Sequence, residues 1–422
     1  MEGGGGGELS RKSKTVACFA KDAVQETEYT LGVPSKNGDP HCKIMNKTKL
    51  AVIGTGGLAQ NQHIPNIYKS DVAELTALCD LRGDVLKELG ECYSVKRLET
   101  DYKKILASAD IEGVVIATRE DSHVPLTLEA LAAGKHVYVE KPLAETTEAC
   151  EQVLRAQRES ALRVAVGMNR RCAPAYRYAR EMLLKNGGAQ NMFYRIADTY
   201  SLNWGIRFGG GKRMIHELCH IFDILRFFAG SEVTEVYCRS GRQDDESLLL
   251  VFASGATATL LSSGYASWQT PKEHFEAVAA QGMLVVEEFV EVRNFGLSAD
   301  DPDVKCFAGH FHPFREQAHV AELERRGYPA LTELRKEIFE QTERLSRLSP
   351  LDPDYSRQKD TRLPLINYSV DKGWQAAIDN FAECIRSGAE QISATAVDGL
   401  RAVEITQAAL RSREIGQPVK VG

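Results

Sequence analysis

The chain has 422 residues, of which 43% are hydrophobic and 26% charged, a composition that excludes a fibrous or fully disordered protein. Its formal net charge of -6 gives no basic footprint for nucleic acid, and no apolar run reaches the roughly 18 residues of a membrane span. The length predicts two domains, and ten cysteines without a CxxC pair predict reduced thiols in a cytoplasmic protein.

The N-terminal segment, residues 1–44, is expected to be a disordered extension. It contains five consecutive glycines, mixed charges and few large apolar residues, and it lacks a helical or strand period. Its apolar stretch is too short for a secretory signal, and its acidic residues argue against a transit peptide. The folded chain is therefore expected to begin near Met45, whether the preceding residues are a native tail or a mis-set start.

The first predicted strand leads into a glycine turn. Leu50–Ile53 is followed by the GxGxxA pattern of Gly54, Gly56, Gly57, Leu58 and Ala59. In a dinucleotide site the first glycine makes the tight turn, and the second lets the backbone approach the pyrophosphate. The small third residue permits close packing of the helix on the strand, and the N–H groups of that helix receive the pyrophosphate.

An acidic residue follows the second predicted strand. Residues 75–79 form an apolar run that ends in Asp80, at the distance expected for the acid that binds the ribose 2′-hydroxyl. The alternative is an acid that only caps the next helix. Asp80 favours NAD because it repels a 2′-phosphate, whereas the neighbouring Arg82 keeps NADP possible.

Short apolar strands then alternate with helices. Strands are predicted at 113–117, 137–139 and 163–166, and helices at 124–133 and 147–160. This alternation is typical of a parallel sheet covered on both faces, whose ligands bind beyond the carboxyl ends of the strands. The side chains that follow these strands are the candidate site residues: Thr118, His123, Glu140, Lys141, Asn169 and Arg171.

Several motifs, in this order and spacing, resemble the Gfo/Idh/MocA oxidoreductases. They are Ala51–Gly56, Asp101–Tyr102, Val115–Thr118 with His123, Ala133–Val137, Glu140–Pro142, and Gly209–Gly211 leading to His220 and Asp223. The resemblance covers roughly residues 49–296 and resumes from Asp371 to the C-terminus.

The resemblance implies an α/β protein with a Rossmann domain over residues 45–168. Residues 169–422 would form an α/β domain on a large, mostly antiparallel sheet, whose open face often serves oligomerisation into a dimer or tetramer. It also implies NAD(P)-dependent oxidation or reduction of a ring hydroxyl of a sugar, sugar derivative or cyclitol. Lys141 would lie near the nicotinamide and the reacting oxygen, and His220 would act as general acid/base.

This chemistry suits the two side chains. Hydride leaves a carbinol carbon as its hydroxyl loses a proton, and histidine titrates near neutral pH. An ammonium group stabilises the developing alkoxide. The predicted cofactor-binding residues are Gly54, Gly56, Gly57, Leu58, Ala59, Asp80, Arg82, Thr118, His123, Glu140 and Lys141. The predicted substrate residues are Lys141, Asn169, Arg171, Trp204, Arg207, His216 and His220.

The sequence departs from the family pattern four residues before His220. His216 stands where the family has an aspartate, so the third catalytic residue is open, with His216 as the candidate. On an α-helix His216 and His220 would share a face, and Glu217 would face elsewhere, though near enough to affect the site. Residues 216–220 also spell HExxH, the motif of zinc metallopeptidases.

Four alternatives to a dehydrogenase therefore stay open. They are a zinc metallopeptidase, a metal bound by both histidines beside NAD, an NAD-dependent glycosidase acting by transient C3 oxidation and elimination, and a non-catalytic cofactor-binding protein. The dehydrogenase interpretation assigns no metal to the site. In the glycosidase, His216 would supply the additional base.

The second half predicts antiparallel strands that include 247–252, 256–261 and 289–293. Residues 297–366 form an insertion, a potential lid or oligomer arm, that contains an amphipathic helix. The apolar positions of this helix are Leu331, Leu334, Ile338, Leu345 and Leu348. His310, His312 and His319, just before it, are expected to be solvated. Helices at 375–386 and 397–412 end the chain.

Overall fold

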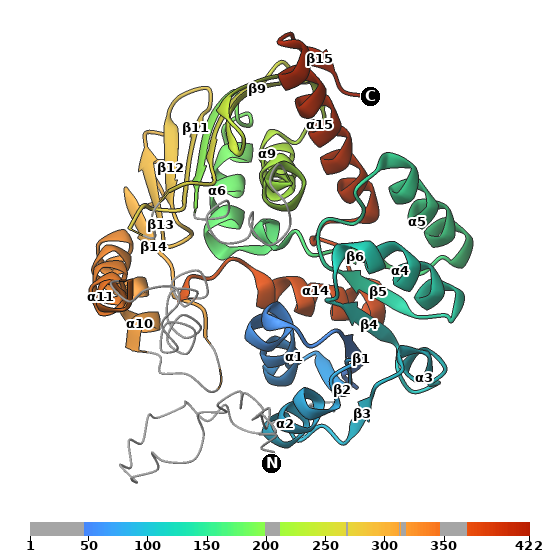
Figure 1. The fold of residues 1–422 in the computed structure, drawn as a ribbon. Helices are drawn as coiled ribbons and strands as arrows, with labels where there is room; N and C mark the ends of the chain where they lie inside the picture. The colour runs from blue at the N-terminus through green and yellow to red at the C-terminus, as the bar shows by residue number, and fades with distance from the viewer. Residues whose placement is uncertain (1–45, 199–211, 267–268, 312, 314–317, 347–368) are drawn as a thin grey trace, which may run out of the picture.

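The computed structural model describes the chain except for residues 1–45, 199–211, 267–268, 312, 314–317 and 347–368. The described residues form two sheets, each with helices packed on it (Figure 1). The predicted disorder of residues 1–44 lies outside the described part. Trp204, Arg207 and Gly209–Gly211 also lie outside it.

The first sheet is parallel and has six strands. They are β1 (Thr48–Ile53), β2 (Ala73–Cys79), β3 (Arg97–Glu99), β4 (Gly113–Ile116), β5 (His136–Val139) and β6 (Val164–Val166). Their order is β3-β2-β1-β4-β5-β6, so the direction of winding reverses between β1 and β4. This is the Rossmann order, and its ligand crevice lies at the carboxyl ends beside that reversal.

Helices cover both faces of this sheet. They are η1 (Ala59–His63) with α1 (Ile64–Lys69), α2 (Gly83–Tyr93), α3 (Tyr102–Leu106), α4 (His123–Ala132), α5 (Thr147–Ser160) and α14 (Trp374–Ser387). Helix α14 comes from the far end of the chain and lies beside α1 (Figure 1). Its Ile378 and Phe381 belong to the same apolar cluster as Leu50 and Val52 of β1. The division at residue 168/169 therefore stays a prediction, since a helix after that boundary packs on the first sheet.

The second sheet has nine strands. They are β7 (Asn191–Ala197), β8 (Val233–Arg242), β9 (Asp245–Phe252), β10 (Thr257–Ser263), β11 (Glu273–Val278), β12 (Met283–Glu287), β13 (Glu291–Phe295), β14 (Val304–Cys306) and β15 (Val419–Lys420). Their order is β14-β13-β12-β11-β7-β10-β9-β8-β15. Only β7 and β10 pair in parallel, so the predicted large, mostly antiparallel sheet is confirmed.

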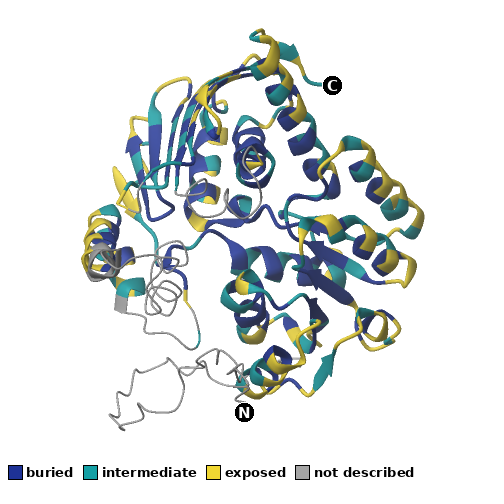
Figure 2. Cartoon of the chain, viewed as in Figure 1, coloured by how far each residue is buried: buried dark blue, intermediate teal, exposed yellow. Residues whose placement is uncertain are grey.

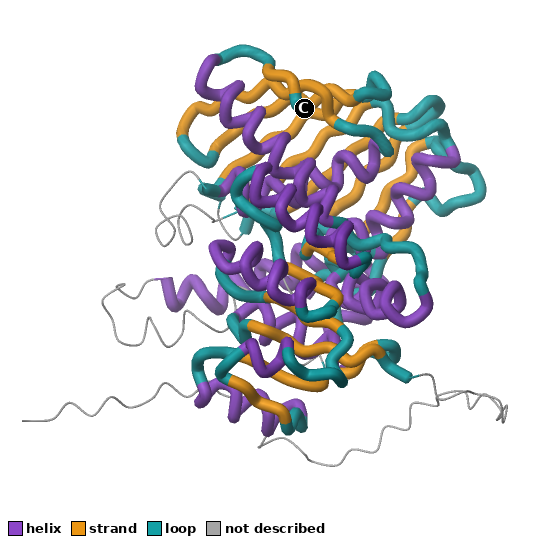
Figure 3. The backbone as a smooth tube through the Cα atoms, turned by 90° about the vertical axis from the view of Figure 1, so that its right-hand side faces the viewer, coloured by secondary structure: helices purple, strands orange, loops and turns teal. Residues whose placement is uncertain are grey.

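Helices α6 (Pro174–Lys185), α9 (Cys219–Ala229) and α15 (Ala396–Ile415) lie on one side of this sheet (Figure 3). Alternate side chains of the strands are buried and exposed (Figure 2). Leu248 and Leu260 are buried, whereas Leu249 and Leu261, on the other face, are each 42% exposed. The oligomer predicted for this open face stays a prediction.

Two of the later predictions change in detail. The strand expected at 289–293 begins only at Glu291, because Glu288 and Phe289 have positive φ and turn the chain between β12 and β13. The amphipathic helix is confirmed as α11 (Tyr328–Ser346), preceded by α10 (Ala318–Arg326). Leu331 and Ile338 are buried, while Leu348 and His312 lie outside the described residues.

The expectation of solvated histidines was wrong for His310, which is buried beside Trp374. Whether the insertion acts as a lid or arm stays a prediction. Among the described helices, none combines the length and apolar character that crossing a membrane requires.

Candidate active site

The glycine turn joins β1 to the helix that follows it. Gly54 has a φ of +92°, and a side chain there would place its Cβ 2.6 Å from the carbonyl oxygen of Ala117. At Gly56 and Gly57 a Cβ would meet no atom within 4 Å, so the turn is open on that side. Ala59 is fully buried. A tight first glycine, an open second one and a small packed third residue fit a dinucleotide pyrophosphate.

Asp80 follows β2 directly and lies beside this turn. Its carboxylate accepts hydrogen bonds from the backbone N–H and hydroxyl of Thr55, at 2.7 and 2.9 Å. The Arg82 guanidinium donates to both carboxylate oxygens. Burial disfavours the charge, but the hydrogen bonds from Arg82 and Thr55 hold the pKa of Asp80 well below its usual range. Asp80 is therefore a fixed negative charge at the place predicted for the ribose.

Thr118 and His123 lie after β4, as predicted. The Thr118 hydroxyl is 2.7 Å from the hydroxyl of Ser122. The buried His123 ring places Nδ1 2.8 Å from the carbonyl oxygen of Pro142 and Nε2 3.4 Å from that of Thr118. His123 thus braces the loop that carries Lys141, and both ring nitrogens face protein carbonyls.

Glu140 is buried under the site and forms a hydrogen bond with His63 that the sequence analysis missed. Its Oε1 lies 2.9 Å from Nε2 of His63, and the side chain of His63 is fully buried. Burial opposes ionisation of Glu140, but His63 and Lys141 hold its pKa below the usual value. His63 lies at the end of η1, directly after the glycine turn. The pair therefore connects the predicted cofactor helix to the Lys141 loop.

Lys141 reaches the segment that contains both histidines. Its Nζ donates a 2.7 Å hydrogen bond to the backbone oxygen of His216. The His216 ring places Nε2 3.8 Å from Oε1 of Glu145, which also binds Lys212 at 2.8 Å. Burial, with Lys141 nearby, lowers the pKa of His216. The side chain of His216 thus faces Glu145, and Lys141 binds its backbone oxygen.

His220 is buried at the start of α9. Among the described residues, its Nδ1 has no hydrogen-bond partner. Burial, Arg170 and Lys141 hold the pKa of His220 well below the usual value, against the opposing charges of Glu217 and Glu273. The ring is therefore neutral at pH 7 and able to accept a proton.

Glu217 faces a different set of side chains from His216. Its carboxylate lies 2.7 Å from Nζ of Lys272 and 3.5 Å from the Arg170 guanidinium. The segment that carries both residues, η4 (Met214–Leu218), is a π-helix, which forms i→i+5 hydrogen bonds. The placement of His216 and His220 on one face stays a prediction.

Three residues after β6 have distinct roles. Asn169 is buried and donates to the backbone oxygen of Lys372 at 2.6 Å. Arg170 forms a buried, two-pronged pair with Glu273. Arg171 binds Asp223 and Asp398, which joins η3 (Asn169–Cys172) to α9 and α15. This geometry gives the predicted substrate role of Arg171 no support, because two carboxylates already engage its guanidinium.

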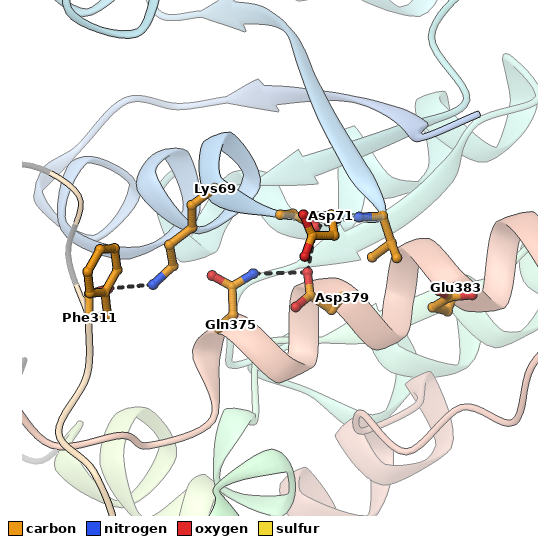
Figure 4. Close-up of a pocket in the computed structure, with 8 residues that line it drawn as sticks. Lys69, Asp71, Phe311, Gln375, Asp379 and Glu383 are labelled. Carbon is orange, nitrogen blue, oxygen red and sulfur yellow. Dashed lines mark hydrogen bonds between the residues drawn. The ribbon is translucent and has the colours of Figure 1, made fainter. Parts of the chain in front are cut away.

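A cavity of about 410 Å³ lies away from these residues, at the amino end of β2 (Figure 4). It is lined by Lys69, Ser70, Asp71, Val72, Phe311, Gln375, Asp379 and Glu383. Burial lowers the pKa of Lys69 to about 8, against the charges of Asp371 and Asp379. None of the predicted site residues lines this cavity.

Comparison with known proteins shows which family the sequence of the first sheet matches. Residues 48–168 match the model of the GFO_IDH_MocA family, described as an oxidoreductase family with an NAD-binding Rossmann fold. An uncharacterized oxidoreductase of Bacillus subtilis, YrbE, is 27% identical over half of this chain, a match that spans 66% of its own length. The D-apiose dehydrogenase of Paraburkholderia graminis is 29% identical, over 57% of this chain and 68% of its own.

Solved structures extend the likeness to the second sheet. The scyllo-inositol dehydrogenase of Lactobacillus casei, with bound NAD(H) and scyllo-inositol, superposes with a TM-score of 0.64 at 20% identity, over 89% of this chain and 99% of its own. An Agrobacterium radiobacter oxidoreductase in complex with NAD+, L-tartaric acid and magnesium reaches 0.67 at 19% identity, over the same shares. Residues 48–168 therefore match the Gfo/Idh/MocA family of oxidoreductases with its NAD-binding Rossmann fold, and the solved structures share the two-sheet fold over 89% of this chain.

Proposed function

We propose that this protein is an NAD-dependent dehydrogenase that transfers hydride between nicotinamide and a ring hydroxyl of a sugar, sugar derivative or cyclitol. The observation that carries the proposal is the 2.7 Å hydrogen bond from Lys141 to the helical segment that leads into His220. This bond joins the Lys141 ammonium to the segment that bears His220, a buried and neutral histidine, at the carboxyl edge of the first sheet. Relatives named as inositol and apiose dehydrogenases support the substrate class.

The residues that would hold the cofactor are those of the glycine turn, Gly54, Gly56 and Gly57, together with Asp80 at the ribose. Bound NAD supplies the hydride acceptor. Among this chain's residues, His220 accepts the hydroxyl proton, since its lowered pKa keeps the ring neutral at pH 7. The Lys141 ammonium stabilises the negative charge that develops on the same oxygen.

The alternative activities gain no support. The glutamate of the HExxH motif binds Lys272 and Arg170, whereas a zincin needs it free as a general base. In the described part of the chain, no three His, Cys, Asp or Glu side chains are grouped to hold a metal ion. A homo-oligomer and a cytoplasmic location remain proposals.

The test supplies purified protein and NAD with myo-inositol, scyllo-inositol or D-apiose and follows absorbance of NADH. We expect NADH to accumulate in proportion to oxidised product with at least one of them. A phenyl glycoside serves as the comparison substrate. Release of its aglycone without net NADH would contradict the dehydrogenase and favour the glycosidase, and NAD binding without turnover on the whole panel would contradict the proposed substrate class.

A further inference from the structure

One carboxylate lies among several cations beside the proposed catalytic pair. Glu217 belongs to η4, one turn before His220, and 13% of its side chain is exposed. Its partner Lys272 precedes β11, and its partner Arg170 lies in η3 after β6. Lys141 and His220 interact electrostatically with the same carboxylate. Segments from both sheets therefore meet at Glu217.

The surrounding charges make this carboxylate ionised. Burial opposes its charge, but Lys272, Arg170, Lys141 and His220 together hold the pKa of Glu217 well below the usual value. Lys272 is also 3.4 Å from Asp198, and Arg170 is fully engaged by Glu273. Lys372 adds a further cation at 3.1 Å from Glu273.

Removing Glu217 would leave an excess of positive charge around His220. Arg170 and Lys141 already disfavour the protonated ring, and Glu217 and Glu273 act against them. Opposite charges within about 4–6 Å typically shift a pKa by 1–3 units. Removal of Glu217 would leave Glu273, which Arg170 and Lys372 share, as the remaining carboxylate of this pair.

His216 does not supply this charge. Its ring faces Glu145, and Lys141 binds its backbone oxygen, which any residue at this position would provide. Position 216, where the family has an acid, is thus neutral here, while the adjacent residue provides a carboxylate that reaches the site from the π-helical segment.

We propose that Glu217 is a positioning residue that provides the fixed negative charge for Lys141 and His220, in place of the acid missing at position 216. This inference rests on the proposed function, since it assigns His220 the proton transfer. Glu217 acts through its neighbours: it keeps Lys272 and Arg170 paired and offsets the positive charge that His220 experiences.

The test compares Glu217→Gln with wild type by kcat/KM against pH on the active polyol, and by NMR titration of the His220 ring. We expect kcat to fall about 10- to 100-fold, the scale of a displaced catalytic group. Because Glu217 raises the pKa of His220, its loss should move the acid limb and the His220 titration to lower pH by about one unit. Glu217→Asp should restore much of the lost kcat and most of the shift in the His220 titration.

Glu276→Gln is the matched control, because Glu276 is also a carboxylate paired with a histidine, His274, but lies on the open face of the sheet. It should leave both profiles unchanged. A fall in kcat for Glu217→Gln without any shift of the His220 titration would show a purely structural role and overturn the proposal. A shifted titration in a protein that oxidises no polyol would instead refute the proposed function and leave the charge coupling intact.

If Glu217→Gln does not fold, the charge-balanced variant Glu217→Gln/Lys272→Gln replaces it, with Lys272→Gln alone as its reference. Loss of the carboxylate in that background should again move the His220 titration to lower pH. Identical titrations in these two variants would overturn the proposal.

Discussion

The ribose end of the proposed cofactor site depends on two side chains, Asp80 and Arg82. The Arg82 guanidinium donates hydrogen bonds to the carboxylate of Asp80, the group that should repel a 2′-phosphate. We expect Asp80→Ser to narrow the difference between NADH and NADPH affinity by about tenfold, because it removes one repulsive charge. Arg82→Ala is the opposite control and should widen the preference for NADH. Fluorescence titration measures both, and tighter binding of NADPH to wild type would refute the assignment of Asp80.

Turnover should depend on Lys141 and His220. Replacing either by alanine should lower kcat/KM about 100-fold or more, while NAD affinity changes little. Lys336→Ala, on an exposed lysine of α11, is the control for lysine loss. Near-normal activity of His220→Ala on the identified substrate would refute its role as the base.

The pH dependence should follow from the buried ring of His220. Its pKa is lowered by burial and by Arg170 and Lys141, so the neutral base stays populated below the ordinary histidine value of 6.5. We expect kcat/KM in the oxidation direction to be flat through pH 7 and to fall only below about pH 6.5. An acid limb centred above pH 7 would mean that the ring is exposed or paired with a carboxylate in the working enzyme.

Between elements, the His63–Glu140 pair joins η1 to the end of β5. Both side chains are buried, so removal of one partner leaves an uncompensated charge. We expect His63→Leu to lower the free energy of unfolding at pH 7 by about 3–5 kcal/mol. The pKa of Glu140 is lowered in the native state, so the pair stabilises above the ordinary pKa of glutamate.

The loss in His63→Leu should therefore shrink as pH falls and Glu140 becomes protonated. Urea unfolding at several pH values measures it, with His63→Leu/Glu140→Gln as the control that also removes the Glu140 carboxylate. A loss that is the same at all pH values would show that His63 stabilises by packing alone.

The sequence predicted those elements whose signals are local. The turn at Gly54 and the acid at Asp80 follow apolar runs at fixed spacing, and Lys141 follows a strand. Glu217 was expected to lie near the site, but its partners Lys272 and Arg170 were not predicted because they lie far from it along the chain. His63 was missed because its partner Glu140 lies 77 residues away.

At the scale of the whole molecule, the amphipathic pattern predicted the last two helices but not their partners. An apolar face shows that a helix is buried, not which sheet it covers. Helix α14 packs on the first sheet through Ile378 and Phe381. Helix α15 enters two cores: Ala402 and Val403 pack with the first sheet, and Ala408 and Ala409 with the second.

These two helices should make the described sheets unfold together. Phe381 is fully buried, with its ring 5.8 Å from that of Tyr138, so Phe381→Ala should cost about 3–5 kcal/mol. Because α15 spans both cores, calorimetry should show a single transition at lower Tm, with near-UV and far-UV signals lost together. Leu184→Ala, at a side chain that is 49% exposed, is the control and should shift Tm little. The opposite result would be two separate transitions, of which Phe381→Ala shifts only the one that NAD stabilises. That result would show that each sheet forms an independent folding unit.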